Sequence, residues 1–283
     1  MKLNEATLEL RVVNPYNPIF ITHLNYIKCF KELSDGLNIE TNRLDKSNKK
    51  INNKKLLNKI LLVKLIKKSL DNEYKACQEN KDFAEVSSIW IPVKSYYLIF
   101  NMFLVLDYLI SPENNKDFNI SHKSLILRIK ELIRKSELIF NKSHFNHFYT
   151  YEEVKDVKFD KGENLKEEQN IEKLTKRLIK KLIEYKKDEF KRDKKIRDLR
   201  KKKDRLSVSE YLSKELTNLF EFFYLFRIKT NYRDLDFLSE DVGPIQFYSY
   251  FENYYLASMS FYQALKKLIN DLSMKRYSEE LIK

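Results

Sequence analysis

The sequence predicts an all-α protein, an antiparallel bundle of helices with an N-terminal helical extension and a long basic helical insertion. Apolar residues recur three and four positions apart through most of the 283 residues, which is the spacing of one helix face. The chain has only three glycines and five prolines, whereas the hairpins of a sheet protein need such residues at their turns. The same shortage excludes P-loop and dinucleotide-binding enzymes, whose phosphate-binding loops need several glycines close together.

Length and composition set further limits. A chain of 283 residues can bury a core without the help of a metal or a disulfide. The two cysteines, Cys29 and Cys77, stand at no metal-ligand spacing, and we expect no cofactor. The most apolar run, residues 96–110, is too short for a membrane span and contains Asn101 and Asp107. Because the N-terminus shows no signal-peptide pattern, the expected location is the cytoplasm, with no membrane partner.

Residues 1–53 are predicted to form an N-terminal arm and one helix. Residues 8–20 contain a short alternating run interrupted by two Asn-Pro pairs, which indicates an arm or an edge strand. The Asn-Pro pair at 17–18 fits the N-cap and the first position of a helix, and this helix should end at Gly36. Residues 40–53 are polar and lack a period, which indicates a loop.

Residues 54–145 are predicted to form the first half of the bundle. Helical spacing of apolar residues covers 54–77. A second helix over 92–110 should begin at its proline, because proline is tolerated in a first turn and breaks a helix interior. Ser121 is the predicted N-cap of a third helix over 122–140. The second helix is apolar nearly all round, so it should lie at the centre, with these core residues: Tyr97, Phe100, Phe103, Leu104 and Tyr108.

The remaining sequence divides into two parts. Residues 146–206 are predicted to form a connector and the helical insertion, in which 165–205 is either one long helix or a helical hairpin. Residues 207–283 are predicted to form the second half of the bundle, with helices over 207–230 and 245–272.

The net charge of +13 is concentrated in the insertion. Between Lys173 and Arg205 the sequence has seventeen Lys or Arg against six Asp or Glu, a local charge of +11. On one helix Arg197 and Lys201 would share a face, because they lie four residues apart. Such a face fits a phosphate backbone, and the predicted nucleic-acid-binding residues are Lys194, Lys195, Arg197, Arg200, Lys201, Lys202, Lys203 and Arg205. A protein-binding surface and a solvated helix without a ligand are the alternatives.

Two segments together resemble motifs of the HEPN superfamily. Residues 93–100 (VKSYYLIF) are similar to that family's paired-tyrosine helix, and His122 opens the following helix, as a histidine does in the family. Residues 223–232 (FYLFRIKTNY) resemble the family's motif of an arginine followed by a polar residue and tyrosine. The resemblance covers 54–140 and 207–272. It implies a helical bundle of the kind found in toxin–antitoxin pairs, antiviral defence and RNA processing.

The arginine motif departs from that of the family's ribonucleases. Those members carry a histidine four to six residues after the arginine, whereas Tyr232 stands at that distance after Arg227. In such a site the arginine stabilises charge on the phosphate, and histidine, which titrates near neutral pH, helps to transfer the 2′-hydroxyl proton. Tyrosine, with a pKa of about 10, is a poor base at pH 7. Arg227, Asn231 and Tyr232 are the candidate catalytic residues, and they could still bind a phosphate or a base without cleavage.

The aromatic and basic residues of these motifs also have structural interpretations. Arg227 could form an ion pair inside the bundle with Asp234 or Asp236. Tyr96 and Tyr97 could be core residues without a ligand.

The histidines have similar alternatives. His122 could serve only to begin its helix with a satisfied hydrogen bond. His144 and His147 lie three residues apart and are followed by Glu152 and Glu153, but no cysteine is near. No metal site is predicted there.

The expected function is therefore that of a HEPN-like protein that interacts with nucleic acid, with RNA favoured over DNA, in a defence or toxin–antitoxin system. As an enzyme it would be a metal-independent endoribonuclease, active as a homodimer in which two arginine helices face each other. As a binding protein it would keep the fold without cleavage. The alternative is a structural or regulatory partner protein that docks through the long charged helix and the C-terminal helix, whose aromatic residues exceed what one buried stripe requires.

Overall fold

The computed structural model describes residues 18–42, 54–111, 118–157, 171–232 and 242–273, and for 18–19 and 229–232 it describes the backbone alone. The predicted arm or edge strand before residue 18, with its cap at Asn17, lies outside these ranges. Within them the elements are helices apart from one two-stranded sheet, which confirms the all-α prediction.

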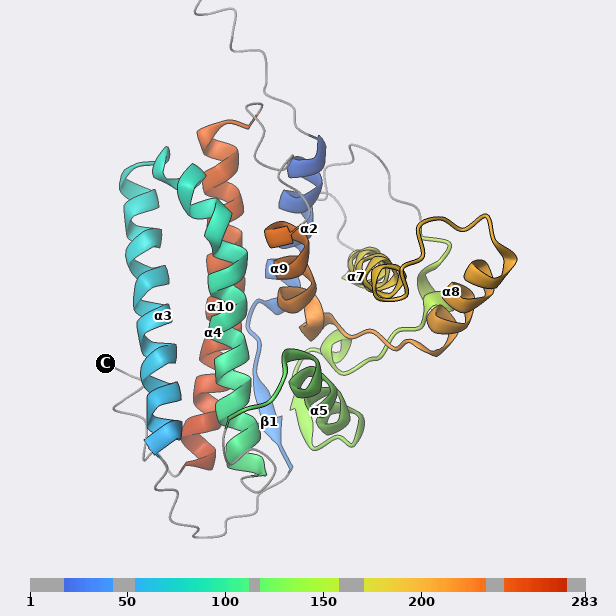
Figure 1. Cartoon of the computed structure of the whole chain (residues 1–283). Coiled ribbons are helices and arrows are strands. Elements are labelled where there is room, and N and C mark those ends of the chain that lie inside the picture. The colour runs from blue at the N-terminus through green and yellow to red at the C-terminus, as the bar shows by residue number, and fades with distance from the viewer. Residues whose placement is uncertain (1–17, 43–53, 112–117, 158–170, 233–241, 274–283) are drawn as a thin grey trace, which may run out of the picture.

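Four helices form the main bundle: α2 (Pro18–Ser34), α3 (Lys54–Glu79), α4 (Phe83–Ile110) and α10 (Pro244–Leu272). Helix α4 packs against α10 and α3, and α2 packs against α10 (Figure 1). Residues 80–82 join α3 to α4, so these two helices are antiparallel. The helices predicted at 54–77 and 245–272 are confirmed. Helix α2 ends at Ser34, and Gly36 follows with a φ of 63°, the left-handed conformation that commonly ends a helix.

Helix α4 begins nine residues before Pro92, so the prediction that it starts at the proline is wrong. Proline has no N–H, and the carbonyl of Ser88 therefore lacks its usual helical donor. The Ser88 hydroxyl is buried and donates to the carbonyl of Phe247 in α10 at 3.2 Å, which ties this stretch to the neighbouring helix. Figure 1 shows that the first turns of α4 bend away from the remainder of the helix, as expected where a helix contains proline.

The rest of α4 is the centre of the bundle, as predicted. Phe103, Leu104 and Tyr108 are buried and Phe100 is half-buried, but Tyr97 is 37% exposed, so its assignment to the core is wrong. By length and composition α4 could cross a membrane, yet 67% of its most apolar window is buried among the other elements. That degree of burial is typical of the core helix of a bundle.

Helix α5 (His122–Arg134) is shorter than the predicted 122–140. Its N-cap is the predicted Ser121, whose hydroxyl accepts from the Ser124 amide at 3.1 Å. Ser136 has a φ of 53°, which ends the helical path. Strand β2 (Leu138–Phe140) follows and pairs antiparallel with β1 (Ile39–Thr41), which occupies the start of the predicted loop.

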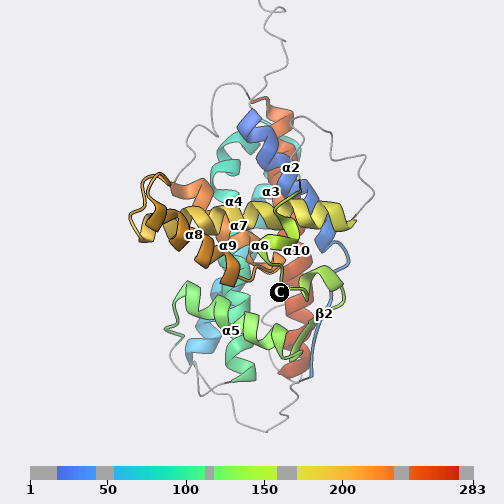
Figure 2. The ribbon, with the colours of Figure 1, turned by 90° about the vertical axis from the view of Figure 1, so that its right-hand side faces the viewer.

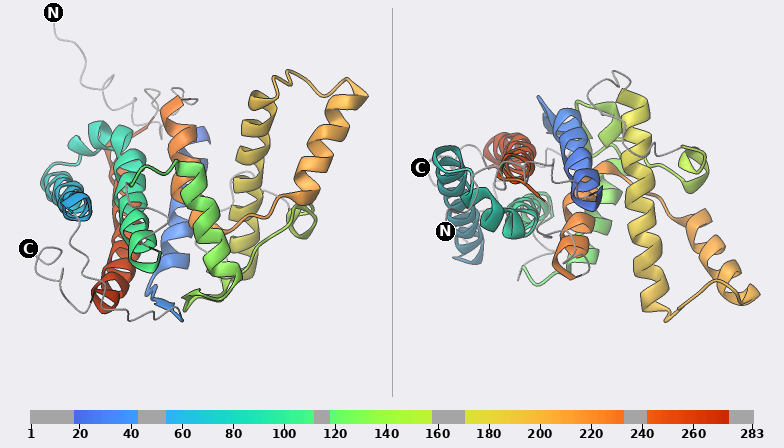
Figure 3. Two further views of the ribbon diagram at one scale, coloured as in Figure 1. Left: turned by 60° about the horizontal axis from the view of Figure 1, so that its bottom comes forward. Right: turned by 90° about the horizontal axis from the view of Figure 1, so that it is seen from above.

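The insertion is a helical hairpin, one of the two forms predicted. Helix α7 (Ile171–Asp193) and helix α8 (Lys202–Lys214) are joined by residues 194–201 (Figure 3). Figure 2 shows α7 lying across the direction of α2 and α10. The connector before it holds a 3₁₀ turn, η2 (Ser143–Phe145), and a one-turn helix, α6 (Tyr151–Val154).

The single helix predicted over 207–230 is wrong. Helix α8 ends at Lys214, and Thr217 then pairs with Tyr149 through two backbone hydrogen bonds of 2.9 and 3.0 Å. Asn218 caps a 3₁₀ turn, η4 (Leu219–Glu221), and its backbone amide donates a hydrogen bond to the Glu221 carboxylate at 2.9 Å. Helix α9 (Phe222–Tyr232) follows. A capping box therefore begins a new helical turn inside the range where apolar spacing had predicted one continuous helix.

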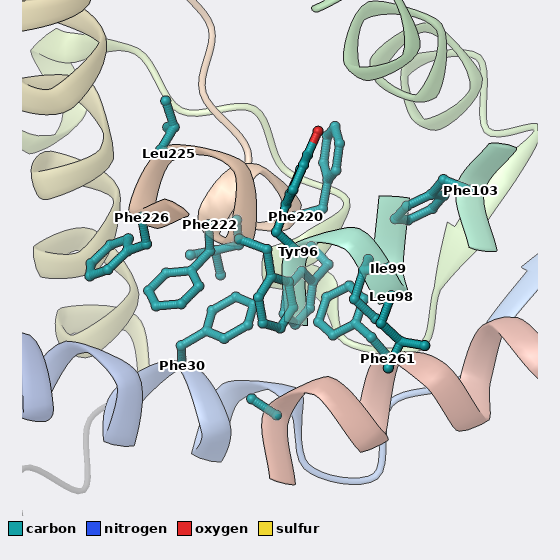
Figure 4. Packing of buried hydrophobic residues seen from close by; sticks show 14 of the residues in the cluster. Phe30, Tyr96, Leu98, Ile99, Phe103, Phe220, Phe222, Leu225, Phe226 and Phe261 are labelled. Atoms are coloured by element: carbon teal, nitrogen blue, oxygen red, sulfur yellow. The ribbon is translucent and has the colours of Figure 1, made fainter. Parts of the chain in front are cut away.

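Aromatic rings fix α9 in the core (Figure 4). Phe222 stacks on Phe30 of α2 with ring centroids 4.0 Å apart, and on Phe226 at 4.0 Å. Tyr185 of α7 meets Phe226 edge to face at 5.3 Å. These contacts hold the helix that carries Arg227 between α2 and α7.

The aromatic residues of α10 pack inside the chain, although their number had indicated a docking surface. They are buried or half-buried: Phe247, Tyr248, Tyr250, Phe251, Tyr254, Tyr255, Phe261 and Tyr262. Tyr255, for example, stacks on Tyr74 of α3 at 4.1 Å. Among the residues that the structure describes, the exposed aromatic rings lie on α4.

Candidate functional site

Helices α4 and α9 bring the paired tyrosines of residues 93–100 together with Arg227. The guanidinium carbon of Arg227 lies 4.5 Å from the ring centroid of Tyr96 and 5.7 Å from that of Tyr97, so the cation rests against two aromatic faces. Its Nη1 donates to the hydroxyl of Tyr97 at 3.4 Å. The ring of Tyr224, one turn earlier on α9, is 5.9 Å away. Arg227 is half-buried, and Tyr97 reaches solvent.

His122, the first residue of α5, belongs to the same cluster. Its Nδ1 forms a hydrogen bond with the hydroxyl of Tyr96. Its ring centroid lies 4.3 Å from that of Phe100 and 6.0 Å from that of Tyr97. Its position at the start of a helix was predicted, but its place beside the aromatic partners of Arg227 was not. We call Tyr96, Tyr97, Phe100, His122, Tyr224 and Arg227 the arginine cluster.

The surroundings keep the imidazole uncharged at neutral pH. Desolvation, and next the charge of Arg227, lower the pKa of His122 below its usual value. Desolvation raises the pKa of Tyr96 and of Tyr224, so both remain neutral phenols. The guanidinium is then the permanent positive charge of the cluster, and the neutral imidazole is able to accept a proton.

A small apolar cavity of about 30 Å³ lies beneath the arginine cluster, between α4, α5 and η4–α9. Tyr96, Phe100 and Tyr224 form part of its wall. The space is far too small for a nucleobase. A nucleotide would therefore have to bind on the outer side of the cluster, where Tyr97 and Arg227 meet solvent.

All eight predicted nucleic-acid-binding residues lie in residues 194–205, which we call the basic tip, and all eight are exposed. The predicted helical face is wrong, because residues 194–201 form a loop and Arg197 and Lys201 share no helix. Lys195 has a φ of 55°, which turns the chain after α7. Arg205 donates to the carbonyls of Leu199 and Arg200 at 3.3 and 3.1 Å and so closes the loop.

The cations of the basic tip have no acidic partner in the part of the chain that the structure describes. Several cations of α7 are instead buried or bonded within the chain. Arg177 and Lys186 are buried, Lys181 pairs with Glu184 at 3.1 Å, and Lys180 donates to the carbonyls of Lys155 and Val157. Much of the local charge of +11 therefore stabilises the fold, and the basic tip is the part of the insertion whose charges are available to bind an anion.

Lys186 is the centre of a buried ion-pair network. Its Nζ lies 2.7 Å from Glu221 and 2.8 Å from Glu215, and it donates to the Thr217 hydroxyl at 3.1 Å. Lys130 of α5 lies 3.4 and 3.5 Å from the same two carboxylates. Burial alone would lower the pKa of Lys186, but the charges of Glu221 and Glu215 outweigh it and raise that pKa. The network joins α5 and α7 to the segment that leads into α9.

The basic tip and the arginine cluster lie on one side of the molecule. Lys123, next to His122, pairs with Glu189 at 3.2 Å and with Asp193 at 3.4 Å, and Asp193 is the last residue before the tip. Figure 1 and the right-hand view in Figure 3 agree that α4, α9 and the end of α7 follow one another along this side. A single ligand could contact both.

The two other candidate catalytic residues, Asn231 and Tyr232, lie in the last turn of α9, where the backbone alone is described. The alternative ion pair between Arg227 and Asp234 or Asp236 also lies outside the described residues.

The histidine pair after β2 is not brought together around a metal site. His144 Nε2 lies 3.0 Å from the carbonyl of Leu33, and His147 Nε2 lies 2.9 Å from Glu153. Among the described residues, no group of three metal-ligating side chains converges.

Sequence reasoning missed His122 as a member of the cluster and Glu221 as the partner of Lys186. The capping-box pattern of Asn218 followed three residues later by Glu221 places Glu221 at the start of a helical turn, but it does not indicate Lys186 as its partner. No local pattern could place His122 beside Arg227, because different helices carry them. Comparisons with protein-family models, with curated proteins and with solved structures give no match.

Proposed function

We propose that this chain is a cytoplasmic HEPN-like protein of a defence or toxin–antitoxin system that binds nucleic acid, and RNA rather than DNA. The observation that carries the proposal is the arginine cluster, in which Arg227 lies against Tyr96 and Tyr97 beside His122, on the same side as the exposed cations of the tip. The preference for RNA over DNA rests on the resemblance to the HEPN motifs.

The two positive features would act differently on RNA. The basic tip offers several point charges on a loop and a helix start, which suits contacts to phosphates without regard to sequence. The guanidinium of Arg227 is held flat against a tyrosine ring, and a planar fork of donors in a fixed orientation suits one phosphate or one base edge. The basic tip would supply most of the binding affinity, and the arginine cluster would fix the position of the strand.

The test is charge reversal of the tip. Arg200, Lys201, Lys202 and Lys203 changed together to Glu should abolish binding of a labelled single-stranded RNA at moderate salt and flatten the salt dependence that remains. The control variant reverses four exposed lysines away from the tip, Lys54, Lys68, Lys75 and Lys135, and so changes the net charge equally. Equal binding by both variants would contradict the proposal. So would preparations of the wild type that carry no nucleic acid at low salt and bind none.

Metal-independent cleavage of RNA is a second candidate, favoured by the position of His122. In such a reaction the 2′-oxygen attacks the adjacent phosphorus, the bond to the 5′-oxygen breaks, and a 2′,3′-cyclic phosphate and a 5′-hydroxyl form. A neutral imidazole can take the 2′-hydroxyl proton, Arg227 can stabilise the charge on the phosphate, and water can supply the proton for the leaving oxygen. His122 would then act as the base at pH 7, a role for which Tyr232 is poorly suited.

Cleavage is tested in the presence of a chelator with purified wild type. Activity that disappears in Arg227→Ala and in His122→Gln, both still folded by circular dichroism, would establish it, since losing one charge-stabilising donor lowers rates by about 10²–10³. Activity at a homodimer should also rise with protein concentration. If wild type bound RNA tightly and left it intact, cleavage would be contradicted and only the binding function would remain.

A further inference from the structure

Helix α4 carries a line of exposed aromatic rings that leads to Arg227. Phe83 is 39% exposed, Trp90 55% and Tyr97 37%, and they lie seven residues apart. Seven residues make nearly two turns of a straight α-helix, so Phe83 and Trp90 lie on one face, and Tyr97 follows seven residues later, beyond the bend at Pro92. Val86, 59% exposed, lies between the first two. Tyr97 ends the line and accepts the hydrogen bond from Arg227.

We propose that this line, the aromatic stripe of Phe83, Trp90 and Tyr97, is a stacking surface for the unpaired bases of a single-stranded RNA. The inference rests on the proposed function and adds which form of RNA is bound and where its bases lie. Aromatic side chains bind bases of any identity by stacking, because every base has a π-face. The bases of a duplex are stacked within it and cannot reach such rings. The stripe therefore selects single strands.

The dimensions of the stripe fit a strand. Seven residues of helix rise about 10.5 Å, and stacked nucleotides are spaced about 3.4 Å along a strand. Each exposed ring would then meet about every third base of a stacked segment. At the end of the stripe Arg227 adds a cation beside a ring, the combination that single-strand-binding grooves use for backbone and base together.

Charge favours RNA over a second copy of the chain as the occupant of the stripe. The chain has a net charge of +13, so two copies repel each other, whereas the phosphates of a strand are attracted. The stripe ends beside Arg227, and the basic tip lies further along the same side, beyond Lys123, which is paired with Glu189 and Asp193. An anionic polymer that passed along α4 would meet positive charge at the end of the stripe.

Trp90 makes the test direct, because it is the only tryptophan in the chain. An unlabelled 12-nucleotide oligouridylate added to wild type should quench the tryptophan emission, while a duplex of equal length should leave it nearly unchanged. In anisotropy titrations with labelled oligouridylate, Phe83→Ala and Trp90→Ala should each weaken binding by about 5- to 150-fold, the effect of losing one base–aromatic stack. Leu65→Ala, a control that truncates a 64% exposed side chain of α3, should bind like wild type.

The outcomes separate the stripe from the proposed function. If Phe83→Ala and Trp90→Ala bound oligouridylate within twofold of wild type while reversal of the tip abolished binding, the stripe would be refuted and RNA binding would stand. If wild type bound no RNA, the proposed function would fail first. If sedimentation showed a dimer of wild type that Trp90→Ala dissociated, the stripe would be an interface between copies and the stacking inference would be overturned.

Discussion

Replacing Lys186 by methionine tests how the insertion is held to the bundle. Methionine keeps most of the length of the side chain and removes the charge. Lys186 is 6% exposed, and its ammonium group lies between Glu215 and Glu221. The substitution leaves two carboxylates near one another, with Lys130 as their one remaining cation among the described residues, at 3.4 and 3.5 Å.

The size of the effect follows from burial. Removing one partner of a buried ion pair costs about 3–5 kcal/mol, because the other charge stays desolvated. For a chain of this size each kcal/mol corresponds to roughly 2–4 °C, so the melting temperature at pH 7 should fall by roughly 6–20 °C. The matched control is Lys214→Met, which breaks an i, i+4 pair with Glu210 at the surface. That change should be small, because an exposed ion pair is screened by water and salt.

The pH dependence has a defined sign. The charges of Lys186 and Lys130 outweigh the desolvation of Glu215 and lower its pKa, so its contribution is present above the unfolded pKa of about 4.3 and is lost as the pH falls through the folded pKa. The pKa of Lys186 is raised, so its contribution is present below about 10.4 and is lost as the pH rises through the folded pKa. The deficit of Lys186→Met should therefore be constant between about pH 5 and pH 10.

Thermal unfolding followed by circular dichroism provides the measurement. A deficit no larger than that of Lys214→Met would refute the reasoning, since it would mean that Lys186 is solvated. The double variant Lys186→Met with Glu221→Gln should recover part of the loss, because one cation and one carboxylate then remain to pair. A double variant as unstable as the sum of the two single ones would show that the pair does not interact.

Three further predictions concern α9 and its neighbours. Arg227→Lys should weaken RNA binding nearly as much as Arg227→Ala, because lysine keeps the charge and loses the planar fork; equal binding by wild type and Arg227→Lys would mean that charge alone matters. The proton NMR titration of His122 should have its midpoint below about 6.5, since desolvation and Arg227 lower its pKa, and Arg227→Ala should move that midpoint upwards. Phe222→Ala should lower the free energy of unfolding by about 3–5 kcal/mol, because its ring is buried and stacks on Phe30; a loss below 1 kcal/mol in urea titrations would contradict that packing.

The long helices could be predicted from the sequence, and most of their ends could not. Apolar spacing located α3 and α10 because each buries one continuous face. The local preference of proline predicted that a helix starts at Pro92. The helix instead continues on both sides of Pro92, and a hydrogen bond from Ser88 ties this stretch to α10. The reverse happened at two other places, where apolar spacing alone would have continued a helix. Ser136, in a left-handed conformation, follows the end of α5, and the capping box of Asn218 begins a new turn after α8 has ended at Lys214.

The candidate site could be predicted only in part, because motifs in the sequence identify residues but do not show which helices pack together. Motif resemblance selected Arg227, Tyr96 and Tyr97, and these three do meet. The absence of a histidine near Arg227 in the sequence had argued against proton transfer. His122 shows the limit of that argument, since a bundle brings the start of α5 to the middle of α9.

The basic tip and the arginine cluster can be separated by the salt dependence of binding. Each phosphate contact on a single strand contributes about −0.7 to the slope of log affinity against log salt, so reversal of four tip residues should reduce the slope by up to about 3. Arg227→Ala removes one contact at most and should change the slope by less than about 1, yet it removes the geometry that the tyrosines impose on the guanidinium. A large loss of affinity with a nearly unchanged slope would therefore identify Arg227 as the residue that positions the strand. A loss of affinity that vanished at high salt would make Arg227 one more charge on the surface.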